Sequence, residues 1–323
     1  MKAIHLYAVM LLAATGGDAQ SQSAYPSKPI RIVVPYVAGG AADITARIVG
    51  QMMAEGLRVP VIIDNKPGAN GMIGTDAVAK AAPDGYTLVL LASGPLVVNP
   101  VLYAKVPYDP VKDFSPISLM TSYQYALTVP TASPIKNLAE LVATAKAKPG
   151  QLSYGSTGVG GGGHLAGVMF GLMSGAEFTH VPYKGAAPAL ADLLGGTLSF
   201  TFDTVVTAAP FVRSGKLRAF AVSGPRRASS LPGLPTMQEV GYKGFDITQF
   251  QGLLAPAKTP AAIIDRLHDE VTKALKVKEV ADRLATEGGY EIVGSTPAAF
   301  GEHIRSDLDR YGKLVKDANI QPE

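Results

Sequence analysis

The chain has 323 residues, of which 47% are hydrophobic and 17% charged, and this length is typical of two domains. That hydrophobic fraction, with a net charge of only +3 and no long basic run, excludes intrinsic disorder and a nucleic-acid partner. The absence of cysteine excludes disulfide scaffolds, thiolate zinc sites and cysteine nucleophiles. The five histidines lack metal-ligand spacing, so we expect neither a metal nor another cofactor.

Residues 1–19 have the pattern of a secretory signal peptide. Lys2 supplies a positive start, residues 6–14 form an apolar run, and Gly17 and Ala19 place small residues at a cleavage site. The run is too short for a membrane span, which needs about 20 residues. Because no cysteine follows for lipid attachment, we expect an exported protein that is free and soluble after cleavage.

The first part of the remaining chain alternates short strands with amphipathic helices. Strands are predicted at 30–34, 59–64 and 86–91, with a helix opening at Asp43 and another at 71–81. This order predicts a parallel sheet with helices on both faces.

A second alternating series begins near residue 123. It comprises strands at 125–129, 152–155, 178–181, 198–202 and 217–222 and helices at 138–147, 164–173, 187–194 and 205–213. A stretch rich in Pro and Gly at 224–235 precedes helices at 261–275, 277–287 and 297–316. This tail holds too little strand for a sheet of its own, so we expect it to fold back on the first lobe.

The sequence therefore predicts an α/β fold of two doubly wound lobes. The first lobe takes residues 25–122 plus 224–323, and the second takes residues 123–223. The chain then crosses between the lobes twice, and a cleft between such lobes is a natural ligand site.

A glycine-rich loop, residues 35–43, joins the first strand to the first helix. Gly39 and Gly40 leave backbone N–H groups uncovered, and the helix N-terminus that follows favours an anion such as phosphate or carboxylate. Asp43 is expected at the N-cap or in the first turn, paired with Arg47 four residues later. The alternative is a turn that merely joins strand and helix.

A second loop, residues 156–164, has the same design. Its sequence is Ser156, Thr157, Gly158, Val159, Gly160, Gly161, Gly162, Gly163 and His164. The glycines match a dinucleotide pattern, but the nearest acid, Glu177, lies before the next strand instead of at its end, which disfavours that function. Two such loops facing each other across a cleft can hold an anion between helix N-termini. His164 either contacts the ligand or caps the local backbone.

Motifs of catalysis are missing from the sequence. It contains neither a GxSxG elbow nor a Walker loop. Asp203 follows a predicted strand, where it either faces the cleft or caps the next helix.

Several short motifs in order resemble one known family across nearly all of the chain after the signal peptide. They are Pro35-Tyr36 with Gly39-Gly40 and Asp43, then residues 65–69, 82–88, 181–185 and 231–236. The family is that of the solute-binding proteins of tripartite tricarboxylate transporters, also called the Bordetella uptake gene (Bug) family.

The resemblance implies a periplasmic binding protein-like fold of type II, without catalytic or metal-binding residues. It implies a periplasmic protein that closes on a small organic carboxylate and delivers it to integral membrane transporter subunits. A monomer is expected as the default state of a soluble receptor. The ligand-binding residues it implies are Tyr36, Ala38, Gly39, Gly40 and Asp43 in the first loop; Ser156, Thr157, Gly158, Gly161, Gly162, Gly163 and His164 in the second; and Ser93, Asp203 and Thr204 for the rest of the ligand.

Two positions depart from the family pattern. Many relatives carry a serine near Gly161, and a tryptophan often stands where this chain has Phe250. Because of these departures, a relative's ligand specificity does not transfer directly. Two other functions are left open by the sequence: a carboxylate sensor for a signalling partner, and a secreted enzyme that uses Ser156 or the second loop.

Overall fold

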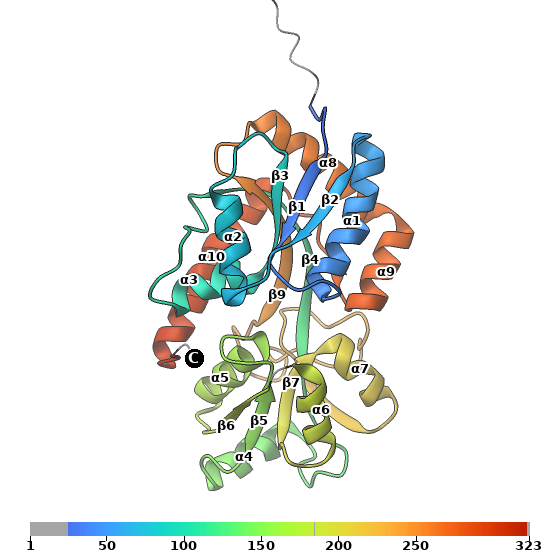
Figure 1. Ribbon diagram of the computed structural model, residues 1–323. Coiled ribbons are helices and arrows are strands. Elements are labelled where there is room, and N and C mark those ends of the chain that lie inside the picture. Colours follow the sequence, from blue (N-terminus) through green and yellow to red (C-terminus); the bar gives the residue numbers. More distant parts are fainter. Residues whose placement is uncertain (1–24, 184, 322–323) are drawn as a thin grey trace, which may run out of the picture.

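The computed structural model describes residues 25–183 and 185–321, and the predicted signal peptide lies outside them (Figure 1). The strands are β1 Ile30–Val34, β2 Val61–Asn65, β3 Thr87–Ala92, β4 Phe114–Pro130, β5 Ser153–Ser156, β6 Thr179–Pro182, β7 Phe200–Thr204, β8 Leu217–Val222, β9 Thr248–Pro256 and β10 Glu291–Ile292. The helices are α1 Ala41–Leu57, α2 Met72–Ala79, α3 Asn99–Leu102, α4 Leu138–Ala147, α5 Gly162–Ser174, α6 Ala186–Leu194, α7 Val205–Arg213, α8 Ala261–Lys276, α9 Lys278–Gly288 and α10 Pro297–Asp317. A 3₁₀ turn, Ala69–Gly71, and a π-helical turn, Gly94–Val98, complete the elements.

The strands form two groups that share β4. In the upper group of Figure 1, β1 lies between the parallel strands β2 and β3, and β9 runs antiparallel between β3 and β4. In the lower group, β5 lies between the parallel strands β6 and β7, while β7 and β8 run antiparallel to β4. We call these groups with their helices lobe 1 and lobe 2. The prediction of two α/β lobes is confirmed, but the sheet is mixed where a parallel one was predicted.

The strand β9 is absent from the sequence prediction. Its nine residues are almost all buried, yet two glutamines, Gln249 and Gln251, interrupt the apolar pattern. Their side-chain amides donate to the hydroxyls of Tyr311 at 3.1 Å and Tyr290 at 2.9 Å. Because buried polar groups are tolerated when hydrogen-bonded, these partners explain how a strand with two glutamines lies inside the sheet.

Strand β4 is also much longer than the predicted strand at 125–129, with 17 residues. It pairs with β9 as far as Gln124, and with β7 and β8 from Tyr125 on, so one strand serves both lobes. At this change of partner, the N–H of Tyr125 donates to Ser223 Oγ at 2.9 Å, and Ser223 Oγ donates to the carbonyl of Ile247 at 2.6 Å. The two chain crossings are therefore hydrogen-bonded to each other.

The limits of the two lobes remain a prediction. The contacts of residues 225–247 indicate to which lobe this segment belongs. Phe245 stacks on Phe202 of β7 with ring centroids 5.9 Å apart, and Tyr242 packs edge-to-face on Phe170 of α5. These contacts favour assigning the segment to lobe 2, with the second crossing near Ile247 instead of residue 223.

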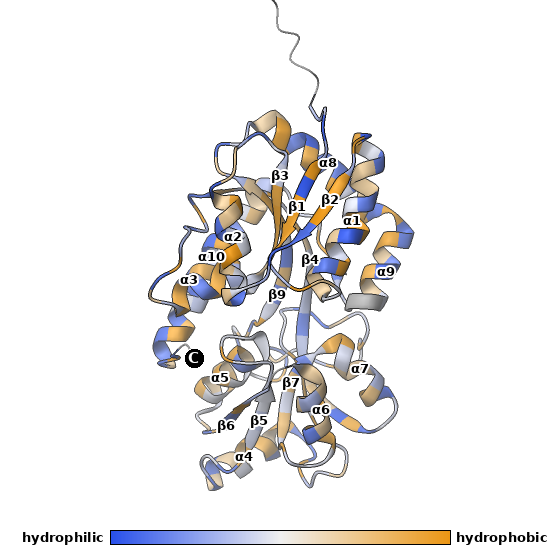
Figure 2. Ribbon diagram, viewed as in Figure 1, coloured by the Kyte–Doolittle hydropathy of each residue, from blue (hydrophilic) through white to orange (hydrophobic). Residues whose placement is uncertain are grey.

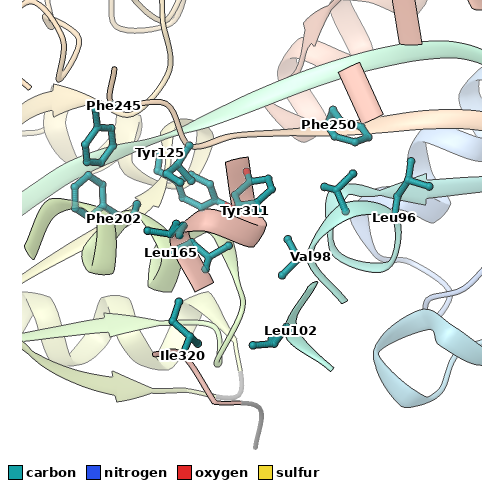
Figure 3. Close-up of a cluster of buried hydrophobic side chains, with 14 of the residues drawn as sticks. Leu96, Val98, Leu102, Tyr125, Leu165, Phe202, Phe245, Phe250, Tyr311 and Ile320 are labelled. Carbon is teal, nitrogen blue, oxygen red and sulfur yellow. The ribbon is translucent and has the colours of Figure 1, made fainter. Parts of the chain in front are cut away.

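Apolar side chains on both faces of the lobe 1 sheet form its core. On one face α1, α8 and α9 pack on the sheet, and on the other α2, α3 and α10 do so, as the prediction of helices on both faces requires. Figure 2 shows apolar residues gathered along β1, β2 and β3. The apolar cluster on the face covered by α2, α3 and α10 continues into lobe 2. It contains Leu96 and Phe250 of lobe 1 together with Leu165 and Phe202 of lobe 2 (Figure 3).

Within the described ranges, no helix combines the length and the apolar character needed to cross a membrane.

Candidate functional site

The two glycine loops occupy equivalent places in the two lobes. The first loop follows β1 and the second follows β5, and each of these strands is the central one of three parallel strands. In sheets of this kind, ligands bind beyond the carboxyl ends of the strands, where the strand order reverses. The two loops therefore share both the predicted sequence pattern and their position after the central strand of a parallel group.

A cavity of about 430 Å³ lies between these loops, and we call it the interlobe cavity. Lobe 1 lines it with the loops after β1, β2 and β3, and lobe 2 with the second glycine loop. The lining residues are Pro35, Tyr36, Val37, Pro67, Gly68, Asn70, Gly71, Gly94, Asn99, Leu102, Tyr103, Thr157, Val159, Gly160 and Gly161. Neither lysine nor arginine is among them.

A smaller cavity of about 160 Å³, the inner cavity, lies in lobe 2 next to the change of partner in β4. Its lining residues are Tyr123, Tyr125, Gly155, Ser156, Thr157, Gly163, Ala186, Ala189, Thr201, Phe202, Asp203 and Thr204. Thr157 lines both cavities, so the two spaces adjoin at this residue.

A ring of hydrogen bonds holds the first loop in shape. Gly39 adopts a φ of +80°, which favours glycine, and its N–H donates to Asp43 Oδ2 at 2.8 Å. Arg47 donates to the same oxygen at 2.9 Å and also to Asn65, whose amide donates to the Tyr36 carbonyl. The predicted first-turn position of Asp43 and its pair with Arg47 are confirmed. Asp43 is buried and braces the loop, and it does not line either cavity.

Replacing Asp43 with asparagine is expected to lower the free energy of unfolding by about 1–2 kcal/mol at pH 7, because charge-assisted hydrogen bonds are lost. Burial opposes ionisation, but the bonds from Arg47 and Gly39, together with the nearby Asn65 amide, outweigh it and lower the pKa of Asp43 below its ordinary value. The carboxylate therefore stabilises the fold above its ordinary pKa, and this stabilisation disappears as the pH falls through the lowered one. Urea unfolding at pH 7 and pH 3 checks this.

Asp282→Asn is the matched control, since Asp282 forms an exposed pair with Lys278 at the same spacing. It should cost well under 1 kcal/mol. A stability gap between native protein and Asp43→Asn that is equal at pH 7 and pH 3 would contradict the role given to the carboxylate.

Two histidines support the second loop, His164 buried and His180 half-buried. His164 Nδ1 accepts a bond from the Gly160 N–H at 3.2 Å, and His180 Nε2 lies 2.6 Å from Ser156 Oγ. Ser156 Oγ in turn contacts the carbonyl and the N–H of Gly158. The imidazole rings lie 4.2 Å apart. Of the two roles considered for His164, the structure supports the capping of local backbone.

The N-termini of the helices that follow the loops have no side-chain caps. Gly40 precedes α1 and Gly161 precedes α5, and neither provides a side chain to accept from the first N–H groups. Such groups carry partial positive charge and attract anions. Many relatives are expected to carry a serine near Gly161. In this protein a Cβ on Gly161 would lie 3.2 Å from Thr157 Oγ1, so the Thr157 hydroxyl lies beside that position.

The predicted site residues divide between the cavities and their supports. Tyr36, Thr157 and Gly161 line the interlobe cavity, and Ser156, Thr157, Gly163, Asp203 and Thr204 line the inner one. The residues that line neither are Ala38, Gly39, Gly40, Asp43, Ser93, Gly158, Gly162 and His164. For all of them, a direct role in ligand binding stays a prediction.

Ser93 and Phe250 belong to the core of lobe 1. Ser93 Oγ accepts the N–H of Phe250 at 2.9 Å, and both residues are buried. The Phe250 ring packs edge-to-face on Phe300 and His303 of α10, away from both cavities. The departure at Phe250 is therefore a change in core packing.

The alternatives for Asp203 are resolved in favour of the cavity. Thr204 caps α7 by accepting from the Thr207 N–H, whereas Asp203 lines the inner cavity. Its Oδ1 accepts the N–H of Thr204 at 2.7 Å, and burial raises the pKa of Asp203 to about 6.

Sequence reasoning missed several lining residues. Asn70 and Gly71 follow the carboxyl end of β2, a position that marks them once the strand order is known. Tyr123 and Tyr125 lie two apart on β4, so both point to the same side of the strand. The spacing of the two tyrosines is visible in the sequence, but the inner cavity that they line is not.

Two α/β lobes joined by shared strands, with a cleft at the carboxyl ends of their parallel strands, define a periplasmic binding protein-like receptor. The sequence pattern of the TctC family, described as the tripartite tricarboxylate transporter family receptor, matches residues 45–320, and the chain belongs to this family.

Individual relatives agree with this assignment. Protein BugT of Bordetella pertussis is 35% identical over 325 residues, covering 99% of each chain. A protein of R. palustris solved with adipate is 32% identical, with a TM-score of 0.78 over 93% of this chain and 100% of that one. MatC of Rhodopseudomonas palustris, solved with bound malate, is 30% identical, with a TM-score of 0.75 over 90% of this chain and 100% of that one. The resemblance is thus confirmed, and the protein is a periplasmic solute-binding receptor and not an enzyme.

Proposed function

We propose that this receptor captures a small organic carboxylate between its two lobes and delivers it to the integral membrane subunits of a tripartite tricarboxylate-type transporter. The observation that carries the proposal is the interlobe cavity, which is lined by both glycine loops and reaches Gly161 at the uncapped N-terminus of α5. At about 430 Å³ it falls in the range of small-molecule sites. The adipate and malate held by the two relatives are both dicarboxylates of this size class.

The donors available for a carboxylate are neutral. Because the described lining residues include neither lysine nor arginine, the negative charge is met by backbone N–H groups and by the polar side chains of Asn70, Asn99, Tyr103 and Thr157. Such donors are fixed in place by the loops, and they strengthen when the lobes close and exclude water. A ligand that touches both lobes then shifts the balance toward the closed form by its differential affinity.

The same proposal covers location and release. A cleaved signal peptide at residues 1–19 carries the chain to the periplasm. The monomer diffuses to the membrane subunits, which recognise the closed form.

Titration of the mature chain with C4–C6 dicarboxylates, tricarboxylates and aromatic acids tests the proposal, with thermal shift as a first screen and calorimetry for affinity. A ligand at 100 times its Kd stabilises the folded state by about 2.7 kcal/mol. We expect a shift with at least one acid and none with NAD. A shift with NAD alone would overturn the proposal.

Thr157→Val tests the site itself. Because this change removes the hydroxyl of a residue that lines both cavities while keeping its shape, we expect affinity for the acid found in the screen to fall about tenfold. Thr131→Val, at an exposed position outside both cavities, should leave affinity unchanged. Equal affinities of the two variants would remove Thr157 from the site.

A further inference from the structure

The inner cavity has a chemical character different from that of the interlobe cavity. Among its described lining residues, Asp203 is the only acid, and no lysine or arginine accompanies it. The remaining polar groups are the hydroxyls of Tyr123, Tyr125, Ser156 and three threonines, together with the backbone at the starts of α5 and α6. A space this small admits only one end of a ligand.

The Asp203 carboxyl has unused capacity to accept hydrogen bonds. Oδ1 receives the Thr204 N–H at 2.7 Å, and no other donor to Asp203 occurs among the hydrogen bonds of the described residues. Burial and this one bond shift its pKa, and no cation among the described residues contributes. A partly buried carboxyl without a cationic partner gains most from a donor that arrives with the ligand.

The neighbouring tyrosines do not meet this need. The rings of Tyr123 and Tyr125 pack against each other with their centroids 6.0 Å apart, and burial raises the pKa of both. They stay neutral, and among the hydrogen bonds of the described residues neither hydroxyl donates to the Asp203 carboxyl. A second carboxylate of the ligand in this space would instead lie against a like charge, which is unfavourable.

We infer that Asp203 selects ligands that carry a hydrogen-bond donor, a hydroxyl or an ammonium group, on the carbon chain of the carboxylate. The donor enters the inner cavity past Thr157 and binds Asp203, while the carboxylate stays in the interlobe cavity. This inference rests on the proposed function and narrows it from carboxylates in general to hydroxy- and amino-substituted ones.

Calorimetry with matched acids tests the inference. Two series are used at pH 7.5: succinate, malate and aspartate, and glutarate, 2-hydroxyglutarate and glutamate. In at least one series we expect the hydroxy or the amino acid to bind tenfold or more tightly than the unsubstituted acid. The hydroxy and amino members distinguish the two kinds of donor.

Asp203→Asn separates selection from a general effect on the site. Because asparagine has the same shape and the Thr204 bond can persist to its carbonyl, the fold is retained. We expect the tenfold preference to fall to about twofold or less, while affinity for the unsubstituted acid is unchanged or rises. Asp265→Asn, an exposed position on α8, is the control and should keep the preference.

Two results overturn the inference while leaving the proposed function intact. One is equal binding of substituted and unsubstituted acids by the native protein, and the other is an unchanged preference in Asp203→Asn. If no carboxylate of either series or of the wider panel binds the native protein, the proposed function fails and the inference fails with it.

Discussion

Replacing Gly162 with alanine is expected to lower ligand affinity about 100-fold and to destabilise the fold by about 1–3 kcal/mol. A Cβ at this position would lie 2.2 Å from the hydroxyl oxygen of Tyr125. Tyr125 cannot easily withdraw, because it is buried and its backbone is bonded to Ser223 where β4 changes partner. The start of α5 must move instead, and with it the N–H groups proposed to hold the carboxylate.

Calorimetry with the acid found in the screen and urea unfolding measure the two effects separately. Gly233→Ala is the control, since a Cβ there meets open space and φ is not positive. It should change neither affinity nor stability. An affinity of Gly162→Ala equal to that of the native protein would show that the start of α5 does not bind the ligand.

Lowering the pH from 6.5 toward 4 is expected to destabilise the protein through two histidines. Burial lowers the pKa of His164 to about 4, with help from the adjacent His180 ring, and burial lowers the pKa of His180 to about 4 as well. In the unfolded chain both titrate near pH 6.5. Between these values the unfolded chain holds more protons, so the free energy of unfolding falls as the pH falls from 6.5 toward 4. The loss approaches roughly 1.4 kcal/mol per pH unit for each histidine.

Urea unfolding at pH 7.5, 6 and 5 gives this profile. In His180→Gln the amide can still bond Ser156 but does not titrate, so the slope between pH 6.5 and 5 should fall by about half. His268→Gln, on α8 outside this pair, serves as the control and should keep the native slope. A slope that is the same in His180→Gln and the native protein would rule out His180 as its source.

Much of the architecture was readable because local patterns and tertiary packing agree. The apolar runs of β1 and β3, and the stripe on α1 that contains Ile48, predicted buried elements that the structure confirms. The two glycine loops were found because each stands between a strand and a helix. Their topological equivalence explains why a local motif was informative about the whole site.

The remaining features depend on contacts between distant residues. Gln249 and Gln251 argue against a buried strand until Tyr311 and Tyr290 are placed opposite them. Asp43 has the residue type of a ligand-binding group, yet its hydrogen bonds to Gly39 and Arg47 make it a brace. The sequence pattern does not tell a ligand-binding aspartate from one that supports a loop, because the difference depends on the direction in which the loop turns.

The position of β9 also determines the order in which the chain can assemble. This strand fills the gap between β3 and β4, although it follows both by more than a hundred residues along the chain. Until residue 256 has been synthesised, the sheet of lobe 1 lacks a central strand and two edges remain open. All the strands of lobe 2 precede β9, so the inserted lobe can mature first. The lobe that holds the amino-terminal strands is thus completed last, which delays closure of the ligand site until nearly the whole chain is present.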